Sequence, residues 1–198
     1  KERYEEAYRI LQELERQEPN NTDILYALGA VHSAMGNSKK AIQYFLKASA
    51  DGYELGMVYG NIGEEYERLG LDREAISYYQ RALEANAKEE RSLHNLCDCY
   101  GYAHLEQQGI NFFTSFVDKH PYSASGWYYL GFLYQGMKLF EKAIDAFEYA
   151  TTIDPAYEDA YTGEAYCYAE LGDLPHAIRT LHEGLEHVSD QASFHSLI

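Results

Sequence analysis

Two short stretches of this sequence contain residue types that bind metal ions or act as nucleophiles. The first is HEGLEH, residues 182–187, in which two histidines flank two glutamates. A zinc site on one helix needs two histidines four residues apart, so that both imidazoles reach one ion. His182 and His187 are five apart, which places them about 140° apart around a helix with 3.6 residues per turn. We therefore interpret this stretch as a surface helix end and expect no metal site.

The second stretch contains His94, Cys97 and Cys99. Because the two cysteines are two residues apart, their side chains point to different sides of a helix and do not converge on one ion. Only one further cysteine occurs in the 198 residues, so the chain has no disulfide framework, and a reducing compartment is the simpler interpretation. We expect a cytoplasmic protein whose cysteines act as small hydrophobic residues.

Other motifs that signal catalysis do not occur in the sequence. It has no G-x-S-x-G nucleophile turn, no phosphate-binding loop and no glycine-rich dinucleotide turn. Paired carboxylates are abundant, as they are on any acidic helical surface, and they carry no catalytic information. We predict that the chain is not an enzyme and binds no cofactor.

Charge and composition restrict the partners that the chain can bind. Its 16 Lys or Arg and 32 Asp or Glu give a formal net charge of −16. Nucleic acids and anionic membranes are bound by clustered basic side chains, so neither is expected as a partner. No apolar run is long enough to span a bilayer. With 46% hydrophobic and 24% charged residues, the composition is neither disordered nor fibrous.

An apolar pattern that repeats every 34 residues predicts the elements that position these side chains. Each unit contains two stretches in which apolar residues are spaced three and four apart, as on one face of a helix. In one unit the first stretch is marked by Trp127, Leu130, Gly131 and Tyr134, and the second by Ala143, Phe147 and Ala150. The same positions recur in the other units, for example at Ile62, Gly63, Ala75 and Tyr79.

The 34-residue period, with W-x-x-L-G-x-x-Y, then A-x-x-x-F-x-x-A, then Pro, resembles the tetratricopeptide repeat (TPR). The resemblance implies an all-α fold, a right-handed superhelical solenoid of antiparallel helix pairs. We expect a single array over residues 1–198. Its parts are the second helix of a truncated repeat at 1–21, full repeats at 22–55, 56–89, 90–123, 124–157 and 158–191, and the start of a further helix at 192–198.

The recurring positions have physical roles in such an array. A helix hairpin cannot bury its apolar face alone, so neighbouring hairpins stack and share a core. A small residue in each first helix is expected to let two helix backbones approach closely. This position is held by Gly29, Gly63, Gly131 and Ala165, and bulky side chains on either side are expected to fill the remaining gaps. C-terminal caps of first helices are expected at Gly36, Gly70 and Gly172.

Four residues need separate interpretation. Trp127 is expected in the core, whereas Tyr128 and Tyr129 are either exposed anchors or pack against neighbouring helices. Glu164 stands where other repeats have Leu or Ile. Because a buried and unpaired carboxylate is costly, we expect Glu164 to be partly exposed or hydrogen-bonded to a tyrosine.

The TPR resemblance implies a binding function, because first helices in this family line a concave groove for extended peptides or partner helices. The side chains between the core positions are the expected groove residues: Tyr26, Asn61, Glu64, Arg91, His94, Asn95, Asp98, Tyr128, Tyr129, Phe132 and Tyr166. Asn61 and Asn95 share one repeat position, where an asparagine in this family commonly holds a ligand backbone. The groove is acidic and aromatic and lacks the lysines of the variety that clamps a carboxylate. We therefore expect a protein or peptide partner that is basic or amphipathic and carries apolar anchors.

Two alternatives to a scaffold with a groove ligand remain. Neither end of the sequence shows a polar capping helix, so exposed apolar end faces favour end-to-end self-association of this fragment and a structural role. The other alternative is a recruiting or regulatory arm of a larger enzyme, whose catalytic residues would lie outside this sequence.

Overall fold

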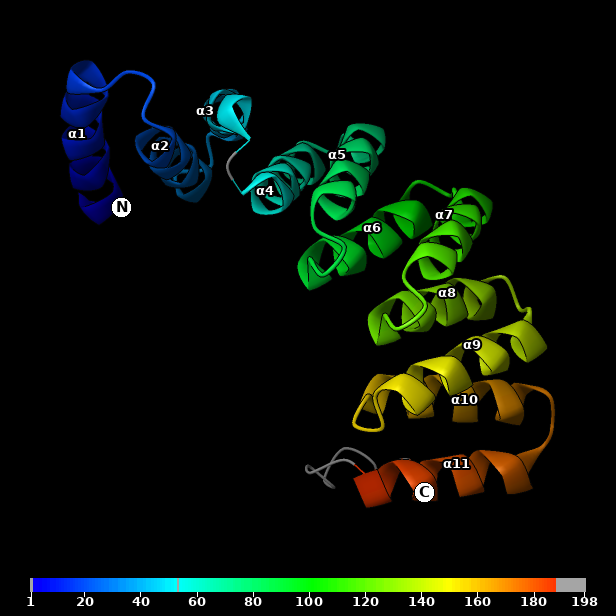
Figure 1. The fold of residues 1–198 in the computed structure, drawn as a ribbon. Helices are drawn as coiled ribbons and strands as arrows, with labels where there is room; N and C mark the ends of the chain where they lie inside the picture. Colours follow the sequence, from blue (N-terminus) through cyan, green and yellow to red (C-terminus); the bar gives the residue numbers. More distant parts are fainter. Residues whose placement is uncertain (1, 53, 188–198) are drawn as a thin grey trace. The chain divides into compact units, whose positions relative to one another are not determined.

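The computed structural model describes residues 2–52 and 54–187. Over these residues it consists of helices joined by short connections, without a β-strand (Figure 1), which confirms the predicted all-α fold. The α-helices are α1 (Glu2–Gln17), α2 (Thr22–Ala34), α3 (Ser38–Ala48), α4 (Leu55–Arg68), α5 (Asp72–Ala85), α6 (Glu90–Tyr102), α7 (Glu106–Lys119), α8 (Ala124–Gly136), α9 (Phe140–Ile153), α10 (Glu158–Glu170) and α11 (Leu174–His187). A 3-10 helix, η1 (Ser49–Asp51), follows α3. The further helix expected at 192–198 lies outside the described residues.

The chain divides into two compact units, Lys1–Ala103 and His104–Ile198. In the first unit α2 packs with α3 and α4 with α5, and each of these pairs also packs on the helix that follows it. In the second unit α8 packs with α9 and α10 with α11, while α9 packs on α10. Each unit is therefore a series of stacked helix hairpins.

In three of the described hairpins the core centres on an aromatic ring of the second helix that lies on a glycine of the first. A Cβ atom added at these glycines would lie only 2.5–2.8 Å from the nearest ring carbon. The pairs are Phe45 with Gly29, Tyr79 with Gly63, and Phe147 with Gly131. The repeat pattern predicted a close approach of two backbones at these glycines with bulky side chains in the remaining gaps, and the structure shows that the space directly over each glycine is filled by an aromatic ring.

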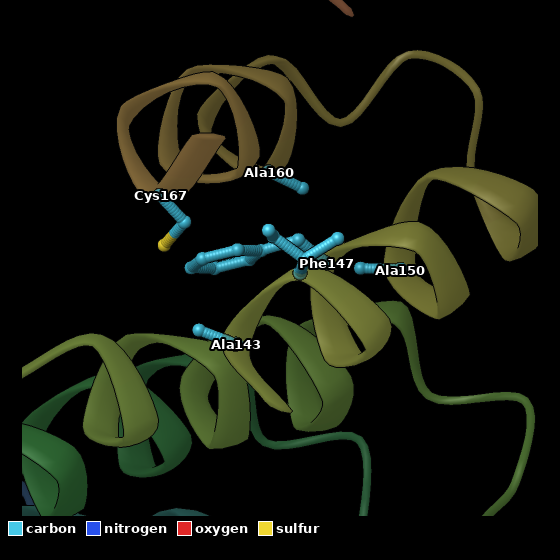
Figure 2. Close-up of a cluster of buried hydrophobic side chains, with 6 residues drawn as sticks. Ala143, Phe147, Ala150, Ala160 and Cys167 are labelled. Carbon is cyan, nitrogen blue, oxygen red and sulfur yellow. The ribbon is translucent and has the colours of Figure 1, made fainter. Parts of the chain in front are cut away.

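Phe147 illustrates how one ring joins three helices. Its side chain is fully buried, and Figure 2 shows it between α9 and α10, where Ala160 and Cys167 face it. A Cβ atom added at Gly163 of α10 would lie 2.7 Å from the same ring. The ring therefore requires a glycine from its own repeat and another from the next one.

Two residues after the end of each described first helix (α2, α4, α6, α8 and α10) lies a residue in the left-handed backbone conformation. At Gly36, Gly70 and Gly172 the φ angles are 75°, 68° and 82°, which confirms the predicted caps. The equivalent residues of the other two repeats are His104 (φ 54°) and Lys138 (φ 59°). Glycine adopts this conformation freely, whereas residues with a side chain are strained in it.

An isoleucine that recurs in the second helices marks the face of each second helix that the following repeat covers. Ile42, Ile76, Ile110 and Ile144 are between 5% and 8% exposed. Ile178 of α11, at the same repeat position, is 50% exposed. Because α11 is the last helix of the described residues, no described helix covers this face, on which Leu174 lies one helical turn before Ile178.

Trp127 differs from its expected position in the core. Its ring is only partly buried at the margin of the α8–α9 core. It stacks on Tyr149, with ring centroids 4.4 Å apart, and its Nε1 donates a hydrogen bond to the Pro121 carbonyl oxygen at 3.0 Å. The polar indole N–H, which needs a partner, holds this side chain at the edge.

Glu164 is buried, with 7% of its surface exposed, so the expectation of partial exposure was wrong. Its Oε1 accepts a hydrogen bond from Thr180 Oγ1 at 3.1 Å, and the partner is thus a threonine instead of a tyrosine. Burial raises the pKa of Glu164 to about 7, against the opposing effect of the Thr180 hydrogen bond.

Candidate functional site

Four of the expected groove residues form one hydrogen-bonded chain in the first unit. Asn61 Nδ2 donates to the Tyr26 hydroxyl oxygen at 2.8 Å. Asn61 Oδ1 accepts from Arg91 Nη2 at 2.9 Å, and Arg91 Nε lies 3.0 Å from Glu64 Oε1. Because these side chains belong to α2, α4 and α6, this series of hydrogen bonds connects the first helices of three successive repeats.

The amide of Asn61 is therefore engaged on both its donor and its acceptor side. A ligand backbone that bound to this amide would have to displace Tyr26 or Arg91. The Arg91 side chain is 51% exposed and that of Glu64 is 23% exposed. Burial raises the pKa of Glu64, and the nearby Arg91 opposes this effect. This part of the first-helix surface links neighbouring repeats to one another.

Asn95 has a different environment, although it shares the repeat position of Asn61. Its Nδ2 donates to the Tyr79 hydroxyl oxygen at 3.1 Å, and that hydroxyl donates to Glu67 Oε2 at 2.9 Å. Asn95, Glu64, Glu67 and Arg68 line an open hollow of about 280 Å³. This hollow is acidic on balance and offers mainly oxygen acceptors.

His94 and Asp98 lie on the outer surface of α6. His94 Nε2 is 3.5 Å from Asp98 Oδ2, and the two side chains are 58% and 36% exposed. They form a surface pair one helical turn apart, and such exposed pairs contribute little to stability.

Tyr128 and Tyr129 of the second unit pack against neighbouring helices. The Tyr128 ring lies 5.8 Å from that of Phe147 and 5.1 Å from that of Tyr157, between centroids. The Tyr129 ring lies 6.0 Å from that of Phe113 of α7. Both tyrosines are half-buried, so packing accounts for much of their ring surface.

Phe132 and Tyr166 are the expected aromatic residues that remain exposed, at 46% and 49%. They are equivalent residues of successive repeats, on α8 and α10. Together with Phe140 they line a hollow of about 320 Å³, which we call the aromatic hollow. Its remaining lining residues are Gln135, Gly136, Lys138 and Glu170.

Phe140 was missed by the sequence analysis, which placed candidate residues on first helices alone. A signal for it does exist in the repeat alignment. The second helices begin with Ser38, Asp72, Glu106, Phe140 and Leu174. The equivalent position holds a polar residue in three other repeats, so an aromatic residue there indicates a contact on the protein surface that is particular to this repeat.

Comparison with known proteins agrees with the hairpins described above. Sequence profiles described as "Tetratricopeptide repeat" match residues 1–54 and 108–198, and residues 58–89. The chain belongs to the tetratricopeptide repeat family. Its TPR hairpins account for the ring-on-glycine cores and for the left-handed turn within each repeat.

Solved structures of other TPR proteins share this fold. A MamA protein is 22% identical, with 84% of this chain and 91% of MamA covered and a TM-score of 0.63. YrrB, a TPR protein with an unusual peptide-binding site, is 14% identical over 94% of this chain and 96% of YrrB, with a TM-score of 0.61. MamA from Desulfovibrio magneticus RS-1 is 16% identical over 83% and 93%, with a TM-score of 0.62. At these identities the similarity shows the fold.

The described part of the TPR chain contains no group of three or more His, Cys, Asp or Glu side chains that could hold a metal ion. All three cysteines are buried. Burial raises the pKa of Cys99 and of Cys167 to about 12, and it also raises that of Cys97, so the thiolate forms are disfavoured. Within residues 2–52 and 54–187, no helix combines the length and the apolar character needed to cross a membrane.

Proposed function

We propose that this TPR chain is a non-enzymatic scaffold that binds a protein segment along the face formed by its first helices. The observation that carries the proposal is the pair of rings at Phe132 and Tyr166, which are about half exposed at equivalent positions beside a hollow. Exposed aromatic surface that borders a hollow is typical of interaction sites. Stacked repeats also offer an extended surface for such a segment.

The proposed partner is a basic or amphipathic peptide segment with apolar anchors. The net charge of −16 favours approach of a positively charged partner. In the first unit, the acceptor oxygens of Asn95, Glu64 and Glu67 border one hollow and suit donor groups such as ammonium or guanidinium. The similar protein YrrB has a peptide-binding site, which is consistent with a peptide ligand for this fold.

A capture experiment with matched variants tests the scaffold function. The full chain, a variant with Phe132→Ser and Tyr166→Ser, and a control variant with Tyr122→Ser and Tyr149→Ser are immobilised and exposed to the same cell lysate. The control removes two exposed tyrosines, 87% and 55% accessible, that do not line the aromatic hollow. We expect the same protein to be retained by the wild type and the control but not by the first variant. Loss in both variants, or in neither, would contradict the proposal.

A second candidate function is assembly through the ends of the array. The apolar face of α11 supports it, since Leu174 and Ile178 are 59% and 50% exposed. Light scattering over a range of concentrations separates this candidate from the scaffold. A mass that rises with concentration in the wild type and stays constant in Ile178→Ser supports assembly, whereas a constant wild-type mass contradicts it.

A further inference from the structure

The aromatic hollow combines apolar walls with a rim that has no net charge. The rings of Phe132, Phe140 and Tyr166 line it, and Lys138 and Glu170 contribute one charge of each sign. A charged side chain would therefore meet one like and one opposite charge at the rim. An apolar side chain would instead cover ring surface that is now in contact with water, which is favourable.

The size of the hollow fits a single side chain. Its volume is about 320 Å³, at the lower end of the roughly 300–1,000 Å³ that ligand pockets occupy. Phe132 and Tyr166 come from the first helices of two successive repeats, so a side chain between them would contact both. Aromatic pairs prefer offset or edge-to-face contacts, and a third ring can be accommodated in this way.

The second unit as a whole carries a net negative charge, whereas the rim of the aromatic hollow carries none. Residues 104–187 contain 13 Asp or Glu and four Lys or Arg. The carboxylate of Glu170, which itself lines the hollow, provides a negative field at Tyr166 and raises the pKa of its hydroxyl. Such a field favours positively charged residues on either side of an apolar anchor and disfavours acidic ones.

We infer that the aromatic hollow is the anchor site for one phenylalanine side chain of a lysine- or arginine-rich segment. The inference rests on the proposed scaffold function and specifies its ligand. The phenylalanine ring lies against Phe132 and Tyr166. The basic neighbours of that phenylalanine meet the acidic surface of the second unit.

Three capped pentapeptides separate the contributions of the anchor and of the charge. Their sequences are KKFKK, KKAKK and EEFEE, and binding of each to the full chain is measured by isothermal titration calorimetry. We expect KKFKK to bind at least about tenfold more tightly than either of the others, a ratio that corresponds to about 1.4 kcal/mol. Equal binding of KKFKK and KKAKK would overturn the anchor site. Equal binding of KKFKK and EEFEE would overturn the requirement for basic flanks.

Variants of the protein locate the binding. Phe132→Ala and Tyr166→Ala are each expected to weaken KKFKK binding by about tenfold, whereas Tyr122→Ala, which removes a tyrosine that is 87% exposed, is expected to leave it unchanged. Because Phe132 and Tyr166 are half exposed, truncation spares the core. Glu170→Gln serves as a second test, because it removes a charge without changing the size of the side chain. We expect this substitution to lower the affinity for KKFKK by a larger factor than the affinity for KKAKK.

The outcomes distinguish this inference from the scaffold function. If KKFKK does not bind, or binds the two ring variants as tightly as the wild type, the aromatic hollow is not the anchor site. The scaffold function fails separately, when the capture experiment retains no protein that depends on the first-helix face.

Discussion

Glu164 of α10 is buried at a repeat position that holds Leu28, Ile62, Leu96 and Leu130 in the other repeats. Burial raises its pKa from 4.5 to about 7. An acid with a raised pKa in the folded state binds its proton more tightly there, so the free energy of unfolding falls as the pH rises from 4.5 towards 7. We expect Glu164→Gln to remove this loss and to raise the free energy of unfolding by about 1–3 kcal/mol above pH 7.

Denaturant unfolding of the wild type and Glu164→Gln across this pH range measures the effect. The two proteins are expected to converge below pH 4.5, because the wild-type carboxyl group is then protonated in both states. Glu186→Gln changes an exposed glutamate of α11 and serves as the control. Parallel pH profiles for the wild type and Glu164→Gln would show that the buried carboxyl group does not determine the pH dependence.

His32 of α2 gives a pH dependence of the opposite sign. It is 2% exposed, with its ring 5.0 Å from that of Tyr8 and 5.4 Å from that of Tyr44, and neither ring nitrogen has a hydrogen-bond partner within the described residues. Burial lowers the pKa of His32, Lys40 adds to this and Glu15 opposes it. The neutral ring therefore stabilises the fold above pH 6.5, and this stability is lost as the pH falls below 6.5.

His32→Phe keeps an aromatic ring but cannot be protonated. We expect the wild type to lose stability relative to this variant as the pH is lowered through 6.5, by up to about 1.4 kcal/mol for each unit of the pKa shift. An NMR titration of the His32 imidazole checks the cause directly. A midpoint at or above 6.5 would contradict the account.

At the residue scale the sequence predicted which side chains lie on first helices but not the partners they take. Asn61 was expected to hold a ligand, yet Tyr26 and Arg91 bind its amide from 35 and 30 residues away. Such contacts depend on how helices stack, which the periodic pattern does not specify. The same limit left open whether Tyr128 is an exposed anchor or packs against neighbouring helices, and the structure shows its ring against Phe147.

The turn within each repeat is the element whose chemistry varies most between repeats. His104 has a φ angle of 54° where Gly172 has 82°. The His104 side chain is 90% exposed, and its ion pair, from Nδ1 to Glu106 Oε1, is long at 3.9 Å. Removing this side chain therefore costs little stability. We expect His104→Gly to raise the free energy of unfolding by about 0.5–1 kcal/mol and Gly172→His to lower it by a similar amount.

Thermal unfolding of this reciprocal pair checks the prediction. A rise in the unfolding temperature for His104→Gly together with a fall for Gly172→His is the expected outcome. If both substitutions lower the unfolding temperature, the left-handed turn at His104 is not a source of strain.

Elements were easier to predict than contacts, because burial acts on every turn of an amphipathic helix and leaves a periodic trace. The 34-residue spacing therefore predicted hairpins and the caps at Gly36 and Gly70. It did not predict the contact made at Gly131, because a small residue accommodates either a second backbone or a ring such as Phe147. Only the packed structure distinguishes these two arrangements.

At the scale of the whole molecule, net charge and exposed rings determine which partners fit. A few aromatic anchors supply most of the affinity in many interfaces, while surrounding charges set specificity and the rate of association. In the proposed interaction, Phe132 and Tyr166, which are about half exposed, supply the rings, and the net charge of −16 supplies the field. The net charge follows directly from the sequence, but the sequence could not show which aromatic side chains stay exposed in the folded protein.

Site-specific photo-cross-linking in cells tests most directly whether the first-helix face binds a protein segment. A photoreactive phenylalanine analogue replaces Tyr166 of α10 in one protein and Tyr149 of α9 in another, two positions that are 49% and 55% exposed. The account predicts a cross-link to a partner protein from position 166 and none to that partner from position 149. Equal cross-linking from both positions, or cross-linking from position 149 alone, would contradict it.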